Sequence, residues 1–572
     1  MTDSAETALK NASLLVALEA GSAPQDYIAA ARADYRRLLT ALYGSGYYGG
    51  TISITVDGRE AANIAPLDAP RAINQVVITV DPGDRFTFGD VQIAPLPPGT
   101  TLLDDLGPRR TAESAVIGDV VRNGISSWRD LGYAKARVVD QRIIARHADA
   151  KLDVDVALDT GPRLRFGPLS VSGNRNVSDD RVREIAGLPE GEVFSPQEMD
   201  AAARRLRRTG TFASVALSEA DQIGPNDTLP INAQVSEANP RRIGFGIELS
   251  SIDGVTLSAF WLHRNLLGGA ERIRMDAQVS GISGETGGID YSLGGTFTRP
   301  ATFGPDTDYF LSGEISRQDE PEFLIDKISL ETGFSRILSD DLTVRAGVGV
   351  LRAREETELE TREYTLFTLP LDATLDRRDE PSNASNGYYL DLGATPFIST
   401  DGEIKGARLY GDARGYVSLG EEEKLTLAGR VQLGSVLGAD LTEAPADFLF
   451  YSGGGGTVRG QPYQSLGIET ALPLGAVPGL EAVTSGGASF LGAQLEARYA
   501  IRENISLVGF YDFGQVGAQA SPLEDAEWHA GAGVGLRYNT GIGPIRLDLG
   551  TQASGDNAGQ DLQVYIGIGQ AF

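Results

Sequence analysis

From Arg241 onwards the chain consists of short segments in which apolar and polar residues alternate. The alternation is clearest in segments 243–250, 342–350, 425–433 and 545–550. Alternation at every second residue places the apolar side chains on one face of an extended strand. Residues 241–572 are therefore predicted to be an all-β region.

Residues 1–240 have a different pattern, in which strands and amphipathic helices alternate. The clearest unit is 161–240, where 169–172 are predicted to form a strand and 176–188 a helix. The sequence Ser-Pro-Gln-Glu at 195–198 is a capping box that begins a second helix. Two more predicted strands follow, at 212–220 and 231–238. The predicted order is β-α-α-β-β, a helix pair covering one face of a three-stranded sheet.

This unit is a repeat. DPGDRFTFG at 81–89 matches DTGPRLRFG at 159–167, at an offset of 159 − 81 = 78 residues. Gly132-Tyr133 matches Gly210-Thr211-Phe212 at the same offset, 210 − 132 = 78. A helix that ends in Gly46-Tyr47 indicates a degenerate first copy. The predicted repeats are 1–80, 81–160 and 161–240.

The polar face of the C-terminal strands distinguishes a membrane barrel from a soluble sandwich, which also alternates. That face carries Glu, Arg, Asp and Gln in the middle of strands, together with many glycines. A polar lumen behind an apolar outer band explains this composition, because a closed sheet pairs every lipid-facing backbone group. The region holds 572 − 240 = 332 residues, so sixteen antiparallel strands would take about 21 residues each, and fourteen or eighteen fit almost as well. The acidic segment 355–363 is expected to be a loop outside the membrane.

Charge and composition argue against several functions. The net charge is −28, from 78 acidic and 50 basic residues, which argues against nucleic acid as a partner. The chain has no cysteine, so thiolate nucleophiles, disulfides and Cys-rich metal sites are excluded, and its three histidines lack metal-ligand spacing. The glycines at 453–456 are not followed by Gly-Lys-Ser/Thr, so they do not form a phosphate loop. We expect no enzyme activity, no cofactor and no metal site.

One arginine stands out within a glycine-rich stretch. GGGGTVRGQPYQSLG, from Gly453 to Gly467, is too flexible to be a strand, and Arg459 is surrounded there by residues with almost no side chain. An arginine in such a loop is expected to reach a partner elsewhere in the molecule. A bidentate guanidinium–carboxylate contact would fix the loop in one place.

Several segments together resemble one family, the BamA–TamA superfamily of outer-membrane insertases and translocators. The three repeats resemble POTRA domains, and Thr-Val-Arg-Gly at 457–460 resembles the Val-Arg-Gly-aromatic loop motif of the superfamily. Further similarities are Phe-Tyr-Asp-Phe-Gly at 510–514, the runs 531–537 and 543–548, and Asp-Arg-Arg-Asp at 376–379 with Gly387. Two positions depart from the family pattern: Gln461 replaces an aromatic residue, and Gln570 stands where the C-terminal signal usually has an apolar one.

The resemblance implies a fold and a site. POTRA repeats of β-α-α-β-β order would precede a barrel at 241–572, with the repeats in the periplasm, the barrel in the bacterial outer membrane and the loop 453–467 folded into the lumen. Arg459 would then pair with Asp512 on the barrel wall, forming a latch with Val458 and Gly460. We expect exchange of Arg459 for Ala to lower activity or stability far more than exchange of Arg430.

The resemblance also implies a mechanism. The barrel would close at a seam where its first strand meets a last strand at 562–572, and Gly567 and Gly569 would weaken that last strand. An opened edge would template the strands of unfolded outer-membrane clients beside the lipid bilayer. The seam residues are predicted to be Ile243, Phe245, Ile247, Gly567, Gly569 and Phe572.

Three functions fit this sequence. Three repeats and the total length resemble the TamA type, which works with an inner-membrane-anchored TamB-like partner that would bind the first repeat. The alternatives are a two-partner secretion transporter, and a passive pore or receptor whose repeats only bind a partner.

Overall fold

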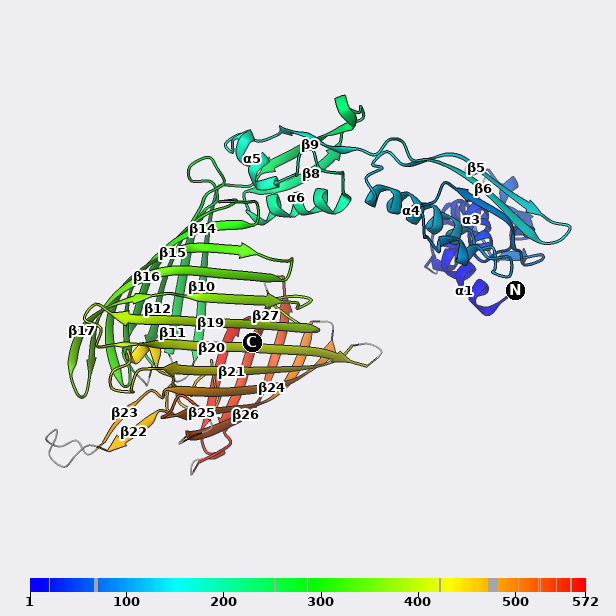
Figure 1. Ribbon diagram of the computed structural model, residues 1–572. Coiled ribbons are helices and arrows are strands. Elements are labelled where there is room, and N and C mark those ends of the chain that lie inside the picture. Colours follow the sequence, from blue (N-terminus) through cyan, green and yellow to red (C-terminus); the bar gives the residue numbers. More distant parts are fainter. Residues whose placement is uncertain are drawn as a thin grey trace. The chain divides into compact units, whose positions relative to one another are not determined.

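In a computed structural model the chain folds into a series of small α+β sheets followed by a β-barrel (Figure 1). The structure describes all residues except 20, 66–69, 251–253, 285–286, 421–422, 472–481, 503, 523, 525, 542 and 556–557. None of the helices in the described residues is both long enough and apolar enough to span a membrane.

Three separate three-stranded sheets precede the barrel. The first has the order β2-β1-β3, the second β4-β6-β5 and the third β7-β9-β8. The elements are α1 (Asp3–Ala12), α2 (Leu14–Ala17), α3 (Pro24–Gly44), β1 (Thr51–Val56), β2 (Arg59–Glu60), β3 (Val76–Asp81), β4 (Thr87–Ala94), α4 (Ser114–Asp130), β5 (Arg137–Arg146), β6 (Lys151–Asp159), β7 (Arg165–Ser172), α5 (Asp179–Ala186), α6 (Pro196–Arg208), β8 (Phe212–Glu219) and β9 (Thr228–Glu237).

Only the third of these units has the full predicted order of β-α-α-β-β. In the second, a 3₁₀ turn at Leu102–Leu106 stands where the first helix was expected. The sequence Pro-Leu-Pro-Pro-Gly at 95–99 explains the difference, because proline removes a helical hydrogen bond and glycine weakens the helix. In the first unit all three described strands follow the helices.

The repeated glycines have a shared structural role. Gly46, Gly132 and Gly210 each follow a helix with positive φ, of 83°, 97° and 67°. The carbonyl oxygen of Gly46 accepts a hydrogen bond from the N–H of Phe86 at 2.8 Å, and that of Gly132 accepts one from Leu164 at 2.9 Å. The linker sequences that match at an offset of 78 residues therefore attach to the preceding unit in the same way.

The C-terminal region forms a closed antiparallel barrel of sixteen strands in the described residues, which confirms the predicted fold class. Both β17 and β18 pair with β16 and β19, so they are two halves of one strand interrupted at Pro370. The strands are β10 (Arg241–Ser250), β11 (Gly254–His263), β12 (Arg272–Ile282), β13 (Asp290–Arg299), β14 (Thr307–Glu320), β15 (Phe323–Ile337), β16 (Leu342–Thr357), β17 (Thr361–Thr368), β18 (Leu371–Asp376), β19 (Gly387–Ser399), β20 (Lys405–Leu419), β21 (Leu425–Leu437), β24 (Ser489–Arg502), β25 (Ile505–Gly517), β26 (Ala526–Thr540), β27 (Gly543–Gln552) and β28 (Leu562–Ile568).

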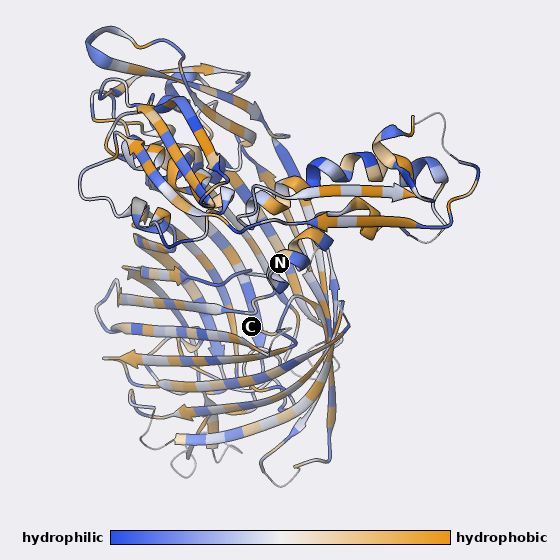
Figure 2. Ribbon diagram, turned by 90° about the vertical axis from the view of Figure 1, so that its right-hand side faces the viewer, coloured by the Kyte–Doolittle hydropathy of each residue, from blue (hydrophilic) through white to orange (hydrophobic). Residues whose placement is uncertain are grey.

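The two faces of the barrel wall differ as the alternation predicts (Figure 2). On β21, Val431 and Leu433 are exposed on the outside, whereas Gln432 between them is only 4% exposed. The same pattern of exposed apolar residues recurs on β15, β24 and β26. An apolar outer surface and a polar interior are what a lipid environment requires.

An apolar cluster, which we call the cap, lies across the interior at the end where β10 finishes. Residues 438–451 contribute to this cluster. Later in the chain, β22 (Ile468–Ala471) and β23 (Ala482–Ser485) form a separate two-stranded hairpin. Phe448 packs edge-on against Phe397, with ring centroids 5.0 Å apart, and Phe450 stacks on Phe490 at 6.2 Å. Buried Glu355 accepts a hydrogen bond from the N–H of Ala446 at 3.0 Å.

Two expectations about strand ends were wrong. The segment 355–363 is not a loop, because β16 continues to Thr357 and β17 begins at Thr361. Its side chains pair across this hairpin, with Glu355 opposite Arg362, so the charges support a strand here. The last strand ends at Ile568, not at Phe572.

Candidate functional site

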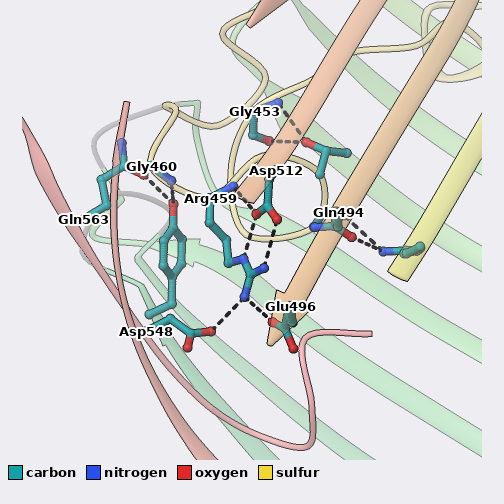
Figure 3. A network of polar contacts seen from close by, with 12 residues as sticks. Gly453, Arg459, Gly460, Gln494, Glu496, Asp512, Asp548 and Gln563 are labelled. Atoms are coloured by element: carbon teal, nitrogen blue, oxygen red, sulfur yellow. Dashed lines mark hydrogen bonds and ion pairs between the residues drawn. The ribbon is translucent and has the colours of Figure 1, made fainter. Parts of the chain in front are cut away.

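The loop 453–467 folds against the inner wall of the barrel, and Arg459 is 1% exposed there (Figure 3). Its guanidinium binds Asp512 on β25 through two parallel hydrogen bonds, from Nε to Oδ2 at 2.7 Å and from Nη2 to Oδ1 at 2.9 Å. The backbone N–H of Arg459 also donates to Asp512 Oδ2 at 3.1 Å. Asp512 thus holds both the side chain and the backbone of the loop.

The structure adds two carboxylates to the pair expected from the sequence. Arg459 Nη1 lies 2.6 Å from Glu496 Oε1 on β24 and 3.3 Å from Asp548 Oδ2 on β27. All three carboxylate side chains are fully buried. The guanidinium carbon lies 3.7 Å from the centroid of the Phe510 ring, which covers one face of the cation.

Two further arginines balance the charge of this cluster. Arg498 Nη2 lies 2.8 Å from Glu496 Oε2, and Arg537 pairs with both Glu496 and Asp548. The cluster therefore consists of three guanidinium and three carboxylate groups: Arg459, Arg498, Arg537, Glu496, Asp512 and Asp548. Because buried charges are tolerated only when paired, removal of any one group leaves another uncompensated.

Glycines on three adjacent strands let the loop approach the wall. A Cβ at Gly531 on β26 would lie 1.9 Å from the carbonyl oxygen of Arg459, and one at Gly550 on β27 would lie 3.0 Å from the N–H nitrogen of Gly460. On β25, a Cβ at Gly514 would lie 2.8 Å from a methyl group of Val458. The sequence analysis did not predict this role, although the alternation of each strand places all three glycines on its inward face.

The other loop residues contact the wall on both sides of the arginine. Val458 is fully buried, and the N–H of Gly460 donates to the hydroxyl of Tyr565 on β28 at 3.1 Å. Gln461, which stands where an aromatic residue was expected, donates its side-chain amide to the carbonyl of Ala530 at 2.8 Å. Tyr463 donates its hydroxyl to Glu320 on β14 at 3.2 Å, so the loop joins two distant parts of the wall.

The seam between β10 and β28 is the weakest junction in the described barrel. It has two paired positions, Leu249 with Ile566 and Ser250 with Tyr565, whereas β27 and β28 share seven and β10 and β11 share ten. Three predicted seam residues lie on β10 with their side chains facing outward, Ile243 being 63% exposed, Phe245 85% and Ile247 56%. None of these three is paired with β28 in the described ladder.

An ion pair crosses the seam on the inner side. Arg546 Nη2 on β27 lies 2.8 Å from Glu248 Oε1 on β10, so the pair spans the intervening strand β28. Gly567 lies beneath it, where an added Cβ would meet Arg546 Nε at 3.2 Å and Glu248 Oε1 at 3.5 Å. Gly567 therefore leaves room for the contact in addition to thinning the strand.

The residues after β28 turn inward and do not take part in the seam. Gly569 has a φ of 104°, which reverses the chain. Gln570 accepts a hydrogen bond from Arg537 Nε at 3.0 Å and donates one to Asn383 at 2.8 Å. Phe572 is buried, with its ring 6.5 Å from that of Tyr416. A polar residue at position 570 suits this inward position, and the placement of Gly569 and Phe572 in the seam strand is corrected.

The barrel and its loop define a class of outer-membrane protein, and comparison with known proteins agrees. The Omp85 superfamily domain matches residues 265–572, more than half of the chain, and a POTRA family, the surface antigen variable number repeat, matches 164–238. The chain belongs to the Omp85 superfamily. Its barrel lies in the outer membrane, with the POTRA region in the periplasm. Because these repeats lead directly into β10, the strand ends near Arg241 face the periplasm and the capped end faces outward.

Relatives and solved structures are similar over most of the chain. It is 22% identical over 517 residues to the outer membrane protein assembly factor BamA of Neorickettsia risticii, covering 83% of this chain and 64% of that protein. BamA of Nitratidesulfovibrio vulgaris is also 22% identical, over 74% of this chain and 53% of that protein. The chain thus spans between about half and two thirds of the length of these relatives.

Two solved structures share the fold. The crystal structure of Haemophilus ducreyi BamA lacking POTRA domains 1–3 has a TM-score of 0.65 and 16% identity, over 84% of this chain and all of that chain. CdiB from Acinetobacter baumannii has a TM-score of 0.53 and 12% identity, over 84% of this chain and 89% of that chain. At these identities the similarity concerns the fold.

Proposed function

We propose that this protein inserts or translocates β-rich outer-membrane proteins through the seam between β10 and β28. The observation that carries the proposal is the two-residue pairing of that seam among the described residues, beside a wall that the Arg459 cluster ties together. Similarity to relatives that are named assembly factors supports the same class of function.

The mechanism needs no nucleotide. When β28 separates from β10, the edge of β10 exposes N–H and C=O groups that have no partner in lipid. An incoming client strand satisfies these groups by pairing with the edge, and folding of the client supplies the free energy. The Arg459 cluster keeps β24–β27 and the loop together, and the loop in turn bonds to Tyr565 of β28, so that the wall opens at one junction.

A disulfide across the seam tests the proposal, because the chain has no cysteine of its own. Leu249 and Ile566 are directly paired, so cysteines at these two positions are close enough to bond. The oxidised Leu249→Cys/Ile566→Cys protein is expected to lose client assembly and to regain it on reduction. Leu427→Cys/Ala497→Cys, across the fully paired β21–β24 junction, is the matched control. Full assembly by the locked seam variant would refute a lateral opening.

We further propose that the protein is of the TamA type and that residues 1–80 bind an inner-membrane-anchored, TamB-like partner. Three α+β sheets before the barrel support this assignment. Val16, 60% exposed, and Val77, 40% exposed on the edge strand β3, are suitable positions for a photo-crosslinking residue. Crosslinking in cells should capture an elongated inner-membrane-anchored protein. Crosslinks to soluble periplasmic proteins alone would contradict the TamA assignment and leave the seam proposal unaffected.

A two-partner secretion transporter is the second candidate, favoured by the similarity in fold to CdiB. The two functions differ in the number of clients. Deletion of the gene should reduce several outer-membrane proteins if the protein is a general assembly factor. Loss of one large secreted protein, with the outer-membrane proteome unchanged, would establish the second candidate.

A further inference from the structure

The outer surface of the barrel carries a row of charged residues on β14 to β17, near its outward end. Cross-strand register places Arg317 of β14, Asp326 of β15, Arg354 of β16 and Glu363 of β17 in one row. Arg352 lies one outward position closer to the membrane centre, opposite Ile328. We call these five residues the charged ladder.

The ladder faces away from the lumen. Ile325 and Ala353, its neighbours in sequence, are buried in the interior cap, so residues of the opposite parity point outward. The arginine side chains are well exposed, at 47% for Arg317, 68% for Arg352 and 56% for Arg354. On β25 and β26 the outward residues at the same end are Phe513 and Trp528, which stack with ring centroids 5.9 Å apart. The ladder therefore distinguishes β14–β17 from the aromatic border on β25 and β26.

An apolar surface continues directly from the ladder towards the membrane centre. Leu293 and Ile315, paired on β13 and β14, lie one outward position deeper than Arg317. They line the same groove of about 760 Å³ as the three arginines, together with Val279 in the row of the ladder. Leu293 is 51% exposed, and Ile315 59%. The groove thus combines an apolar part at the depth of lipid chains with guanidinium groups at the depth of headgroups.

The arginines are paired weakly enough to exchange partners. Arg317 lies 3.5 Å from Asp326, Arg352 lies 3.0 Å from Glu363, and Arg354 lies 2.7 Å from Glu356. Each of these carboxylates is more than two fifths exposed, and ion pairs in contact with solvent contribute little to stability. A phosphate group accepts paired hydrogen bonds from guanidinium at least as well as a carboxylate does.

We propose that the charged ladder binds the phosphate groups of lipopolysaccharide in the outer leaflet, with acyl chains lying along the apolar groove beneath it. This partner combines what the surface offers: several phosphates at headgroup depth and acyl chains below them. The ladder would fix the β14–β17 side of the barrel in the outer leaflet. The proposal is independent of the assembly function.

Native mass spectrometry of the full chain, stripped of lipid in detergent, tests the site with diphosphoryl lipid A as the probe. The variant Arg317→Gln/Arg352→Gln/Arg354→Gln is expected to bind roughly a hundredfold more weakly, because each cation near a lipid surface contributes about a fivefold factor. Arg274→Gln is the matched control, since Arg274 faces the lumen beside Asp276, and it should bind as the parent does. Heat-modifiable migration on a gel checks that each variant is folded.

A second variant is expected to strengthen the binding of lipid A, and a gain in affinity cannot result from a loss of folding. Asp326→Asn/Glu363→Gln removes two competing carboxylates and should bind the same lipid A more tightly. Equal binding by the arginine variant and the parent would overturn the proposal. So would equal binding of lipid A without phosphates, or a preference for phosphatidylglycerol, which would show a general affinity for anionic lipid.

Discussion

At the residue scale, the Arg459 cluster shows what sequence motifs reveal and what they leave out. The pairing of Arg459 with Asp512 follows from two recognisable motifs, 53 positions apart in the chain. Glu496 lies in none of the recognised motifs, and Asp548 ends the run 543–548 but was not assigned to the arginine, because the approach of both carboxylates depends on the register of four neighbouring strands. For Glu496 the inward direction of its side chain was the available signal, and many inward residues in this acidic chain share it.

Exchange of Arg459 for Ala is expected to destabilise the barrel by about 3–5 kcal/mol, because it leaves buried carboxylates without their cation. Arg459→Lys should be intermediate, since lysine keeps the charge but not the paired hydrogen bonds. The midpoint of thermal unfolding, followed by heat-modifiable migration on a gel, measures the effect.

Arg430 is a poor reference for this experiment, because it pairs with Asp412 at 2.7 Å and donates to the loop carbonyl of Gly456 at 3.4 Å. Arg274→Ala is a better one, as Arg274 has an exposed partner on the same strand. An equal loss of stability in Arg459→Ala and Arg274→Ala would argue against a latch.

At the scale of elements, alternation predicted the strands well but not their ends. The segment 355–363 was expected to form a loop because it is acidic, yet cross-strand ion pairs keep it extended beyond the membrane band. The last strand ends early because Gly569 reverses the chain, and single-sequence alternation cannot show a turn at a glycine in advance. The absence of the first helix from the second repeat could have been predicted from the sequence, since three prolines lie in the segment 95–98.

The ion pair between Glu248 and Arg546 is an element-scale contact, because it joins β10 to β27 across the seam. Glu248 is half exposed, so the pair should be worth about 0.5–1 kcal/mol. Glu248→Gln and Arg546→Gln are each expected to lower the yield of the Leu249→Cys/Ile566→Cys disulfide about two- to fivefold. The exchange Glu248→Arg/Arg546→Glu should restore it. Unchanged disulfide yields in both single variants would show that the ion pair does not stabilise the seam.

The third repeat should respond to acid through Glu237. Burial by itself would raise the pKa of this carboxyl, but backbone hydrogen bonds from Arg175, Val177 and Asn176 outweigh it and lower the pKa overall. A group with a lowered folded pKa contributes stability above its unfolded pKa of about 4.3 and loses that contribution as the pH falls through the folded value.

Hydrogen-exchange protection factors of helix α5 measure this effect. They should fall between pH 6 and pH 3 in the parent protein, and the variant Glu237→Gln should have lower protection at pH 6 with a smaller pH dependence. Asp221→Asn, at an exposed carboxyl, is the control. A parent-like pH dependence in Glu237→Gln would contradict the assignment.

At the scale of the whole molecule, composition and pattern together gave the architecture, because a closed barrel imposes one rule on every strand. Strand number was left open between fourteen, sixteen and eighteen, since loop lengths vary along the chain. The cap was not foreseen either. Phe448 and Phe450 lie in a segment without periodicity, and they gain packing partners only when the ends of seven strands meet across the lumen.

The cap has a consequence for the cell envelope. A barrel of sixteen strands without it would be a hole through the permeability barrier, and the packed aromatic side chains of the cap lie across that path. The variant Phe448→Ser/Phe450→Ser should therefore conduct ions in planar bilayers and make cells sensitive to large antibiotics such as vancomycin. Phe303→Ser, at a residue 90% exposed at the periplasmic end, should do neither. Equal, low conductance of both variants would mean that other parts of the chain close the lumen. On the proposed function, the capped end and the sparsely paired seam would together direct client strands sideways into lipid, so the outer membrane would keep out antibiotics while its own proteins enter.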